Sequence, residues 1–381
     1  MKYEIYRIHK YILLYVPPIL IILGTFGNIF SFIILKRKAM LKFSTYFYLM
    51  ILAIADTLVL YIGLLRLWVG ELTGFDLKNQ ADWLCKLTTV IGYTVSDFSV
   101  WLIIAVTTER FIVVCHPLKA NAMCNTPRAR KVILALLLVM FCINLHFFWT
   151  VKIRNFRHKG EVIPQCTAAE QYDWLVNEVW PWVDAFIYSF LPFLVIMMLN
   201  VLIIRQVVKA RRSRSHLAEM RSYEQRRPSH EGSTRLTVML LTISFAFLLT
   251  TLPMNITNIT AYFWRQYRGD LHEVSKYTLA RTITEMLMYI NHSMNFFLYC
   301  ATGQKFRHQL IWMVCYAKRT YNLSWGSEQG SQATTRLESI RNGIVHKNRK
   351  MPATSGVEMF ATIKSDMYTP LKINKTVDGY L

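Results

Sequence analysis

Three carboxylic acids lie within or beside long apolar stretches of the chain. Asp56 and Asp97 are each surrounded by mostly apolar residues, and Glu285 directly precedes a stretch without charged residues. Ionisable groups are costly inside a bilayer, so an acid in a membrane-spanning segment marks a functional site by default. The chemistry open to such acids is the binding of a cation, either a metal ion or a basic group of a ligand.

Uncharged polar side chains occupy the middle of other apolar stretches. They are one asparagine, Asn28, one serine, Ser99, and a stripe in NHSMNFFLYC that consists of Asn291, Asn295 and Tyr299. The members of the stripe recur every four residues and so share one helix face. If the stretches form a bundle, these groups converge on Asp56 at mid-depth. Oxygen ligands of this kind suit a small hard cation such as sodium. A hydrogen-bonded packing network without an ion is the alternative.

Seven stretches approach the length that a bilayer helix needs, about 20 mostly apolar residues. They are residues 11–35, 43–65, 87–108, 132–151, 185–204, 236–264 and 286–304. Hydrophobic residues make up 53% of the chain and charged residues 18%, against roughly 25% charged residues in a soluble domain. The pattern predicts an all-α membrane protein, a seven-transmembrane helix bundle. The first stretch exceeds the apolar core of a signal peptide, about 7–15 residues.

Basic residues predict the orientation of the bundle. With the N-terminus outside, the loops 36–44, 111–131 and 205–235 face the cytosol and are rich in Lys and Arg, as the positive-inside rule requires. The net charge of +21 then falls on the cytoplasmic face, where a basic surface meets anionic lipid rather than nucleic acid. We therefore expect a multi-pass plasma-membrane protein with an extracellular N-terminus and a cytoplasmic C-terminus.

The seven cysteines cannot all pair with one another. The predicted orientation leaves only Cys85 and Cys166 on the oxidising side of the membrane. Because disulfides persist in that compartment, a Cys85–Cys166 disulfide is predicted. Two separate surface thiols are the alternative.

Two prolines and one charged dipeptide suggest moving parts. Pro192 in FLPF and Pro253 in TTLP each remove a backbone hydrogen bond and permit a kink, although prolines are also common in such helices. Glu109 and Arg110 are adjacent at the end of the third stretch. The arginine could pair locally and be released on rearrangement, or be an ordinary boundary residue.

The chain divides into four predicted regions. Residues 1–10 form an extracellular N-terminus and residues 11–302 the seven-helix domain. Residues 303–319 alternate basic and apolar side chains, which is typical of an amphipathic helix on the membrane surface, here a short eighth helix. Residues 320–381, rich in Ser, Thr, Gly, Asn and Lys, are predicted to form a disordered cytoplasmic tail.

Together these residues resemble the rhodopsin-like (class A) G-protein-coupled receptors over roughly residues 11–317. The motifs that carry the resemblance are Gly27–Asn28, LAIAD ending at Asp56, Cys85 at the family's spacing from Arg110, Glu109–Arg110–Phe111 in place of Asp-Arg-Tyr, Pro192, Phe247, Pro253, and NFFLY (295–299) in place of NPxxY. Within the family the chain is most similar to invertebrate neuropeptide receptors of the FMRFamide-receptor group. The resemblance implies a receptor that activates a heterotrimeric G protein and is not itself an enzyme.

The resemblance assigns roles to particular residues. The implied sodium pocket is Asn28, Asp56, Ser99, Asn291 and Asn295, with no other cofactor. The implied activation switch is Glu109, Arg110, Val100, Pro192, Phe247, Pro253, Asn295 and Tyr299. Arg110 and Leu118 would contact the G protein, Cys315 is a palmitoylation candidate, and the tail could recruit arrestin. Phe296 and Thr251 replace the family's usual proline and tryptophan, so the details of switching differ.

The family's ligand site lies among the outer halves of the helices. Gly92 stands where amine receptors carry an acid, and residues 286–304 lack the lysine that retinal needs. The candidate contacts are Arg66, Tyr93, Asp97, Asp184, Tyr188, Asn255, Asn258, Arg281 and Glu285. Buried acids suit an arginine or amine and amides suit a peptide amide, so the expected ligand is a short, basic, C-terminally amidated neuropeptide. Internal pairing of Glu285 with Arg281 or Arg66 is the alternative.

Other functions fit the sequence less well. A receptor for a lipid or small metabolite is the first alternative. A transporter or channel would show internal repeats or a ring of like charges, and neither is evident. A membrane enzyme would need a cluster such as HExxH or paired aspartates, whereas the acids here are dispersed.

Overall fold

A computed structural model describes residues 2–158, 161–220, 231–264 and 271–315. The chain divides into two compact units, residues 1–313 and 314–381. Of the second unit only Val314 and Cys315 are described, so the predicted disordered tail lies outside the described residues. Everything that follows on the fold concerns the first unit.

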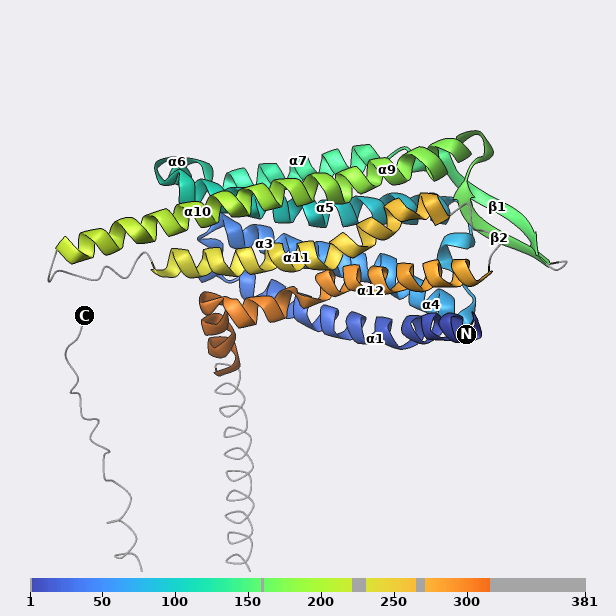
Figure 1. The fold of residues 1–381 in the computed structure, drawn as a ribbon, viewed down its shortest axis with the longest axis horizontal. Coiled ribbons are helices and arrows are strands. Elements are labelled where there is room, and N and C mark those ends of the chain that lie inside the picture. The colour runs from blue at the N-terminus through green and yellow to red at the C-terminus, as the bar shows by residue number, and fades with distance from the viewer. Residues whose placement is uncertain (1, 159–160, 221–230, 265–270, 316–381) are drawn as a thin grey trace, which may run out of the picture. The chain divides into compact units, whose positions relative to one another are not determined.

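Seven helical segments form the first unit, which confirms the predicted fold class (Figure 1). In chain order they are α1 (Lys2–Leu35); α3 (Ser44–Val59) with η1 (Leu60–Leu65) and α4 (Arg66–Thr73); α5 (Asp82–Cys115); α7 (Thr126–Asn144) with α8 (Phe147–Thr150); η4 (Leu175–Val179) with α9 (Trp180–Asp184), η5 (Ala185–Phe190) and α10 (Leu191–Met220); α11 (Glu231–Trp264); and α12 (Leu271–Thr302). The connections carry α2 (Lys38–Leu41), η2 (Leu77–Asn79), α6 (Pro117–Met123) and η3 (Glu170–Tyr172).

Six of the described segments are long and apolar enough to cross a membrane. They are Glu4–Leu35, Ser44–Thr73, Asp82–Cys115, Thr126–Thr150, Leu175–Ala210 and Leu236–Asn258. The seventh segment, α12, is not among them because polar residues interrupt its apolar run. Those residues, Asn291, His292, Ser293 and Asn295, are all buried. They face the interior of the bundle, where a polar side chain can find partners.

A close helix contact joins α1 to α12. Two glycines on α1 let the backbones approach, because a β-carbon at Gly27 would lie 2.9 Å from that of Phe296, and one at Gly24 would lie 2.9 Å from the Ser293 hydroxyl. Phe296 fills this contact with its ring, edge-on to Phe26 at 6.1 Å between centroids. The proline that the family has at this position is thus replaced by a packing residue.

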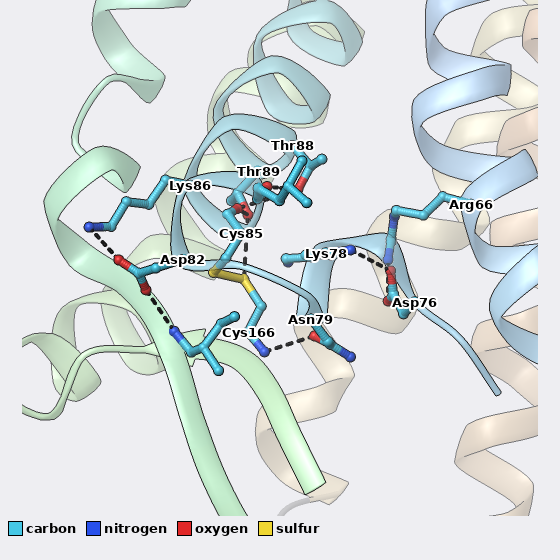
Figure 2. The surroundings of a disulfide bond; sticks show 12 residues. Arg66, Asp76, Lys78, Asn79, Asp82, Cys85, Lys86, Thr88, Thr89 and Cys166 are labelled. Carbon is cyan, nitrogen blue, oxygen red and sulfur yellow. Dashed lines mark hydrogen bonds and ion pairs between the residues drawn. A yellow bond between two sulfur atoms is a disulfide. The ribbon is translucent and has the colours of Figure 1, made fainter.

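A β-hairpin covers one end of the bundle, called the hairpin end below. Strands β1 (Val151–His158) and β2 (Glu161–Ala168) pair antiparallel, with Val151 opposite Ala168. The predicted disulfide is confirmed: Cys166 on β2 is bonded to Cys85 on α5 (Figure 2). The N-terminal end of α1 lies at this same end of the bundle (Figure 1).

A further helix, residues 304–315, follows α12 after Gly303. Phe306 is buried and its ring lies 5.4 Å from that of Tyr299. Ile311 and Trp312 are exposed, while Lys305 lies over the ring of Phe43 at 4.1 Å. One apolar side packed on the bundle and another left exposed are typical of a helix on a membrane surface. The rest of the predicted stretch 303–319 lies outside the described residues.

Candidate ligand-binding cavity and polar centre

A cavity of about 740 Å³ lies among the helices at the hairpin end. Its volume falls within the roughly 300–1,000 Å³ that is typical of ligand sites. Every predicted ligand contact whose side chain is described lines it: Arg66, Tyr93, Asp97, Asp184, Tyr188, Asn258, Arg281 and Glu285. The side chain of Asn255 lies outside the described residues. Residues spread over five of the seven segments therefore meet in one space.

Two carboxylates make one side of the cavity acidic. Asp97 on α5 is only 2% exposed, and its Oδ2 accepts a hydrogen bond of 2.7 Å from the Asn144 amide on α7. Its Oδ1 has no hydrogen-bond partner among the described residues. The Asp184 carboxylate interacts electrostatically with Asp97. Two like charges held together away from water favour the binding of a cation between them.

Asp97 has a partner on another helix, the Asn144 amide, which its own position in the sequence does not indicate. Asn144 donates to Asp97 and to the Met140 carbonyl, the latter at 2.9 Å. Asn144 is fully buried. A polar residue inside the fourth apolar stretch could have been recognised in the sequence as a buried hydrogen-bonding group. Hydropathy alone does not say which neighbouring helix such a residue faces.

Basic residues also line the cavity. Arg66 pairs with Asp76 at 2.6 Å, between α4 and the loop that follows it. The alternative of internal pairing through Glu285 is not what the structure shows, because within the described part of the chain neither Arg66 nor Arg281 makes an ion pair with Glu285. Glu285 does interact electrostatically with both arginines at longer range.

Lys78 on η2 also lines the cavity, and the sequence analysis did not identify it. It lies in the connection between the second and third segments, outside the membrane-spanning helices. Burial and the neighbouring Arg66 guanidinium lower the pKa of Lys78 from its ordinary value to about 8. In the sequence, only its position shortly before Cys85 could have indicated this location. The disulfide of Cys85 holds the connection next to the hairpin.

Aromatic side chains form the wall nearest the hairpin. Trp180 on α9 packs on Phe147 at 5.3 Å and on His146 at 4.1 Å between ring centroids. Tyr93 stacks on Phe147 at 4.8 Å. The Tyr188 hydroxyl, buried at the floor, has no hydrogen-bond partner among the described residues. Such a wall suits an aromatic or apolar ligand side chain, and the hydroxyl suits a polar one.

The second site is a polar centre built on Asp56, which is fully buried. Its Oδ1 accepts from the Ser99 hydroxyl at 2.7 Å and lies 2.8 Å from His292 Nδ1. Its Oδ2 accepts from the Asn295 amide at 2.7 Å. Residues of α3, α5 and α12 are thereby joined at one carboxylate.

The other two members of the predicted sodium pocket, Asn28 and Asn291, make no hydrogen bond to Asp56 among the described residues. Asn28 donates to the His292 carbonyl at 3.1 Å, and its Oδ1 is without a hydrogen-bond partner among the described residues. Asn291 is buried, but within the described residues it makes no hydrogen bond to Asp56. His292, to which the sequence assigned no role, instead contacts the carboxylate. The sequence shows a histidine directly after Asn291, but it does not show that the imidazole of this histidine points toward Asp56.

These contacts bear on the sodium ion that the resemblance implies. Oxygen donors of the right kind are present in the Asp56 carboxylate, the Ser99 hydroxyl and the unpartnered Asn28 Oδ1. The His292 nitrogen lies at the same carboxylate oxygen as Ser99. An imidazole N–H and a cation would therefore compete for Asp56, and the hydrogen-bonded network is the alternative to the ion.

At the end opposite the hairpin, Glu109 and Arg110 do not pair. The Glu109 carboxylate accepts from the Ser44 hydroxyl and, at 2.8 Å, from the Thr45 hydroxyl of α3. Arg110 is buried, and its Nε lacks a hydrogen-bond partner among the described residues. Of the two alternatives that the sequence left open, local pairing of these two residues is not what the structure shows, because the α3 hydroxyls bind the Glu109 carboxylate.

The other predicted switch residues are spread over several segments of the bundle. Val100, Phe247 and Tyr299 are buried, and Pro192 lies near the start of α10 and Pro253 inside α11. At the end opposite the hairpin, Leu118 on α6 is 95% exposed. Cys315 is exposed as well.

A seven-segment membrane bundle with a charged cavity at one end and a buried polar centre is the architecture of a transmembrane receptor. Residues 27–299 match the family described as 7 transmembrane receptor (rhodopsin family), and the chain belongs to that family. Its members are receptors rather than enzymes.

Individual relatives are peptide receptors by name. The chain is 30% identical to an FMRFamide receptor of Drosophila melanogaster over 78% of its own length and 52% of the relative's. It is 25% identical to growth hormone secretagogue receptor type 1 of Rattus norvegicus over 83% and 85% of the two chains. It is 23% identical to neuromedin-U receptor 2 of Mus musculus over 77% and 72%. The chain thus spans about half the length of the Drosophila relative.

Proposed function

We propose that this receptor binds an extracellular neuropeptide that is short, basic and C-terminally amidated, and that it then activates a heterotrimeric G protein. The observation that carries the proposal is the pair of interacting carboxylates, the buried Asp97 and the half-buried Asp184, in a cavity large enough for several peptide side chains. An arginine or amine of the ligand is the natural partner for such a pair, because it neutralises the charge where water does not.

The rest of the cavity fits the same ligand. Tyr93, Tyr188 and Trp180 offer surfaces for aromatic side chains, and Asn258 offers an amide that can pair with a peptide backbone or terminal amide. The name of the Drosophila relative specifies a peptide in which arginine precedes a C-terminal phenylalanine amide. A lipid or small-metabolite receptor is the second candidate, but the several charged groups of both signs that line the cavity favour a peptide.

The proposed orientation places the hairpin end outside the cell. The Cys85–Cys166 disulfide supports it, because disulfides persist on the oxidising side, and so does the basic character of the loops at the other end. In this orientation Arg110 and Leu118 face the G protein, the tail is available to arrestin, and Cys315 could be palmitoylated at the lipid surface.

We also propose a sodium ion at the polar centre as an allosteric ligand. Asp56, Ser99 and Asn28 are the residues that would hold it, and a bound cation would neutralise the buried carboxylate. In this chain the ion would also have to displace the His292 imidazole from the Asp56 carboxylate before it could bind.

The peptide proposal is tested by nucleotide exchange. The receptor, purified in lipid nanodiscs, is mixed with a purified heterotrimeric G protein and a library of amidated neuropeptides, and the rate of guanine-nucleotide loading is measured. At least one basic amidated peptide should raise the rate, and the Asp97→Asn receptor should need much more of it. Acceleration by lipid extracts but by no peptide would overturn the proposal in favour of the second candidate.

A further inference from the structure

A second cavity, called the groove below, lies along α5 and α7 at the end of the bundle opposite the hairpin. Its volume is about 360 Å³, and the connection from α6 to α7 closes one end of it. Figure 1 shows α6 at the end of the bundle away from the hairpin. Two of its lining residues are strongly exposed, Val132 on α7 at 41% and Met123 at 45%. The groove is therefore open to the surroundings of the bundle.

Most of the groove is apolar, and its length matches one leaflet of a bilayer. The apolar lining residues are Trp101, Ile104, Ala105, Ile112, Met123, Ala129, Val132 and Leu136. The Trp101 indole N–H donates to the Ile187 carbonyl at 3.2 Å, so the indole offers only its apolar ring surface to the groove. Trp101 and Ile112 are about three helical turns apart on α5, a rise of about 16 Å at about 1.5 Å per residue. The hydrocarbon core of a bilayer is about 30 Å thick, so the groove is long enough for an acyl chain of one leaflet.

Two charged residues, Glu109 and Arg128, line the groove. The Glu109 carboxylate is buried and accepts hydrogen bonds from the Ser44 and Thr45 hydroxyls of α3. Arg128 is exposed, and its guanidinium makes no ion pair within the described part of the chain. It lies in the first turn of α7, where the helix dipole also favours a negative charge. The groove thus combines an apolar length with one available cation at its polar end.

We infer that the groove binds an anionic phospholipid, with an acyl chain between α5 and α7 and the phosphate group at Arg128. A guanidinium is suited to phosphate because its N–H donors can bind two phosphate oxygens at once. In the proposed orientation this end of the bundle lies in the cytoplasmic leaflet, which carries the anionic lipids. A sterol or a zwitterionic lipid would fill the apolar length but would bring no net negative charge to Arg128. The lipid site is separate from the peptide site and needs no peptide.

A cysteine in the groove reports directly on its occupancy. Cys124 is half-buried, lines the groove, and donates through its thiol to the Glu109 carbonyl at 3.9 Å. An acyl chain in the groove therefore covers this thiol and contacts the end of α5 and the connection before α7 together. Cys115, also half-buried and on the last turn of α5, does not line the groove. It serves as a control within the same molecule.

The lipid site is tested by the rate at which N-ethylmaleimide modifies each cysteine, measured by peptide mass spectrometry. The receptor, purified in a neutral detergent, is titrated with dioleoylphosphatidylglycerol or with dioleoylphosphatidylcholine. Phosphatidylglycerol should protect Cys124, and not Cys115, at about a fivefold lower concentration than phosphatidylcholine, as expected for one cationic residue near a lipid surface. Arg128→Gln should remove this difference. Lys131→Gln is the matched control and should keep it, because Lys131 is exposed on the same helix and does not line the groove.

A second pair of variants tests the apolar part of the groove. Val132→Trp places a large side chain in the groove from its open side and should remove the protection of Cys124 by either lipid. Leu134→Trp, at an exposed position of α7 outside the groove, should leave the protection unchanged. Equal protection by the two lipids in wild type, or a preference that survives Arg128→Gln, would overturn the anionic phospholipid. Absence of protection of Cys124 by both lipids would overturn the groove as a lipid site.

Discussion

Replacing Asp97 by Asn removes one charge from the acidic side of the cavity and changes little else. The side chains have the same shape, and an asparagine oxygen can still accept the 2.7 Å hydrogen bond from Asn144. Because Asp97 interacts unfavourably with Asp184, the loss of its charge should not destabilise the fold. The effect should therefore fall on ligand binding.

The size of the effect follows from burial. Breaking a buried charge pair by removing one partner costs about 3–5 kcal/mol. Asp184 remains and keeps part of the attraction, so we expect a smaller cost than this range, about 2–3 kcal/mol. At about 1.4 kcal/mol per factor of ten, this corresponds to a loss of potency of about 30- to 150-fold for a peptide that carries a basic residue.

The assay is a concentration–response measurement in cells at matched surface expression. The same peptide with citrulline in place of arginine, which keeps the shape without the charge, reports whether the charge is what Asp97 binds. Glu71→Gln is the control, because Glu71 pairs with Lys10 and does not line the cavity. If Asp97→Asn weakens the arginine and citrulline peptides equally, or weakens neither, Asp97 does not bind the ligand's cation.

Sodium sensitivity should depend on both Asp56 and His292. Asp56→Asn should abolish the sodium dependence of agonist affinity, and His292→Ser should increase it by taking the imidazole off the carboxylate; a dependence that survives Asp56→Asn would place the ion elsewhere. Gly27→Ala should lower the thermal midpoint, because its β-carbon would lie 2.9 Å from that of Phe296 and overpacking costs about 1–3 kcal/mol. Gly70→Ala, whose nearest new contact is 3.8 Å, should shift the midpoint less, and equal shifts would contradict the close approach.

Motif positions predicted much of the candidate site. All eight described ligand candidates line one cavity, because the resemblance places them at the outer halves of the helices. The residues that the sequence analysis did not assign, Lys78, Asn144 and His292, stand outside those positions. Lys78 belongs to a connection, and connections follow the hairpin and disulfide rather than a helical repeat. Asn144 and His292 act on acids of other helices, which a spacing rule within one helix does not reveal.

The pairing of charges also differed from what proximity in sequence indicated. Arg281 and Glu285 are one helical turn apart, yet Arg66 takes Asp76 and Arg281 makes no ion pair among the described residues. Glu109 and Arg110 are adjacent, yet the Ser44 and Thr45 hydroxyls take the acid. A charged residue close in sequence is only one of several possible partners for a side chain, because packing brings other hydrogen-bonding and charged groups within the same distance.

Hydropathy, spacing and residue type are local properties of a chain, and they were enough to establish the helical segments, the inward-facing polar stripe of α12 and the Cys85–Cys166 bond. The partners of Asp56, Asp97 and Glu109 were decided only when helices distant in sequence crossed. A hydrogen bond or ion pair forms within a few ångströms, and which groups come that close depends on the relative rotation and depth of two helices. Those are properties of the packed bundle alone.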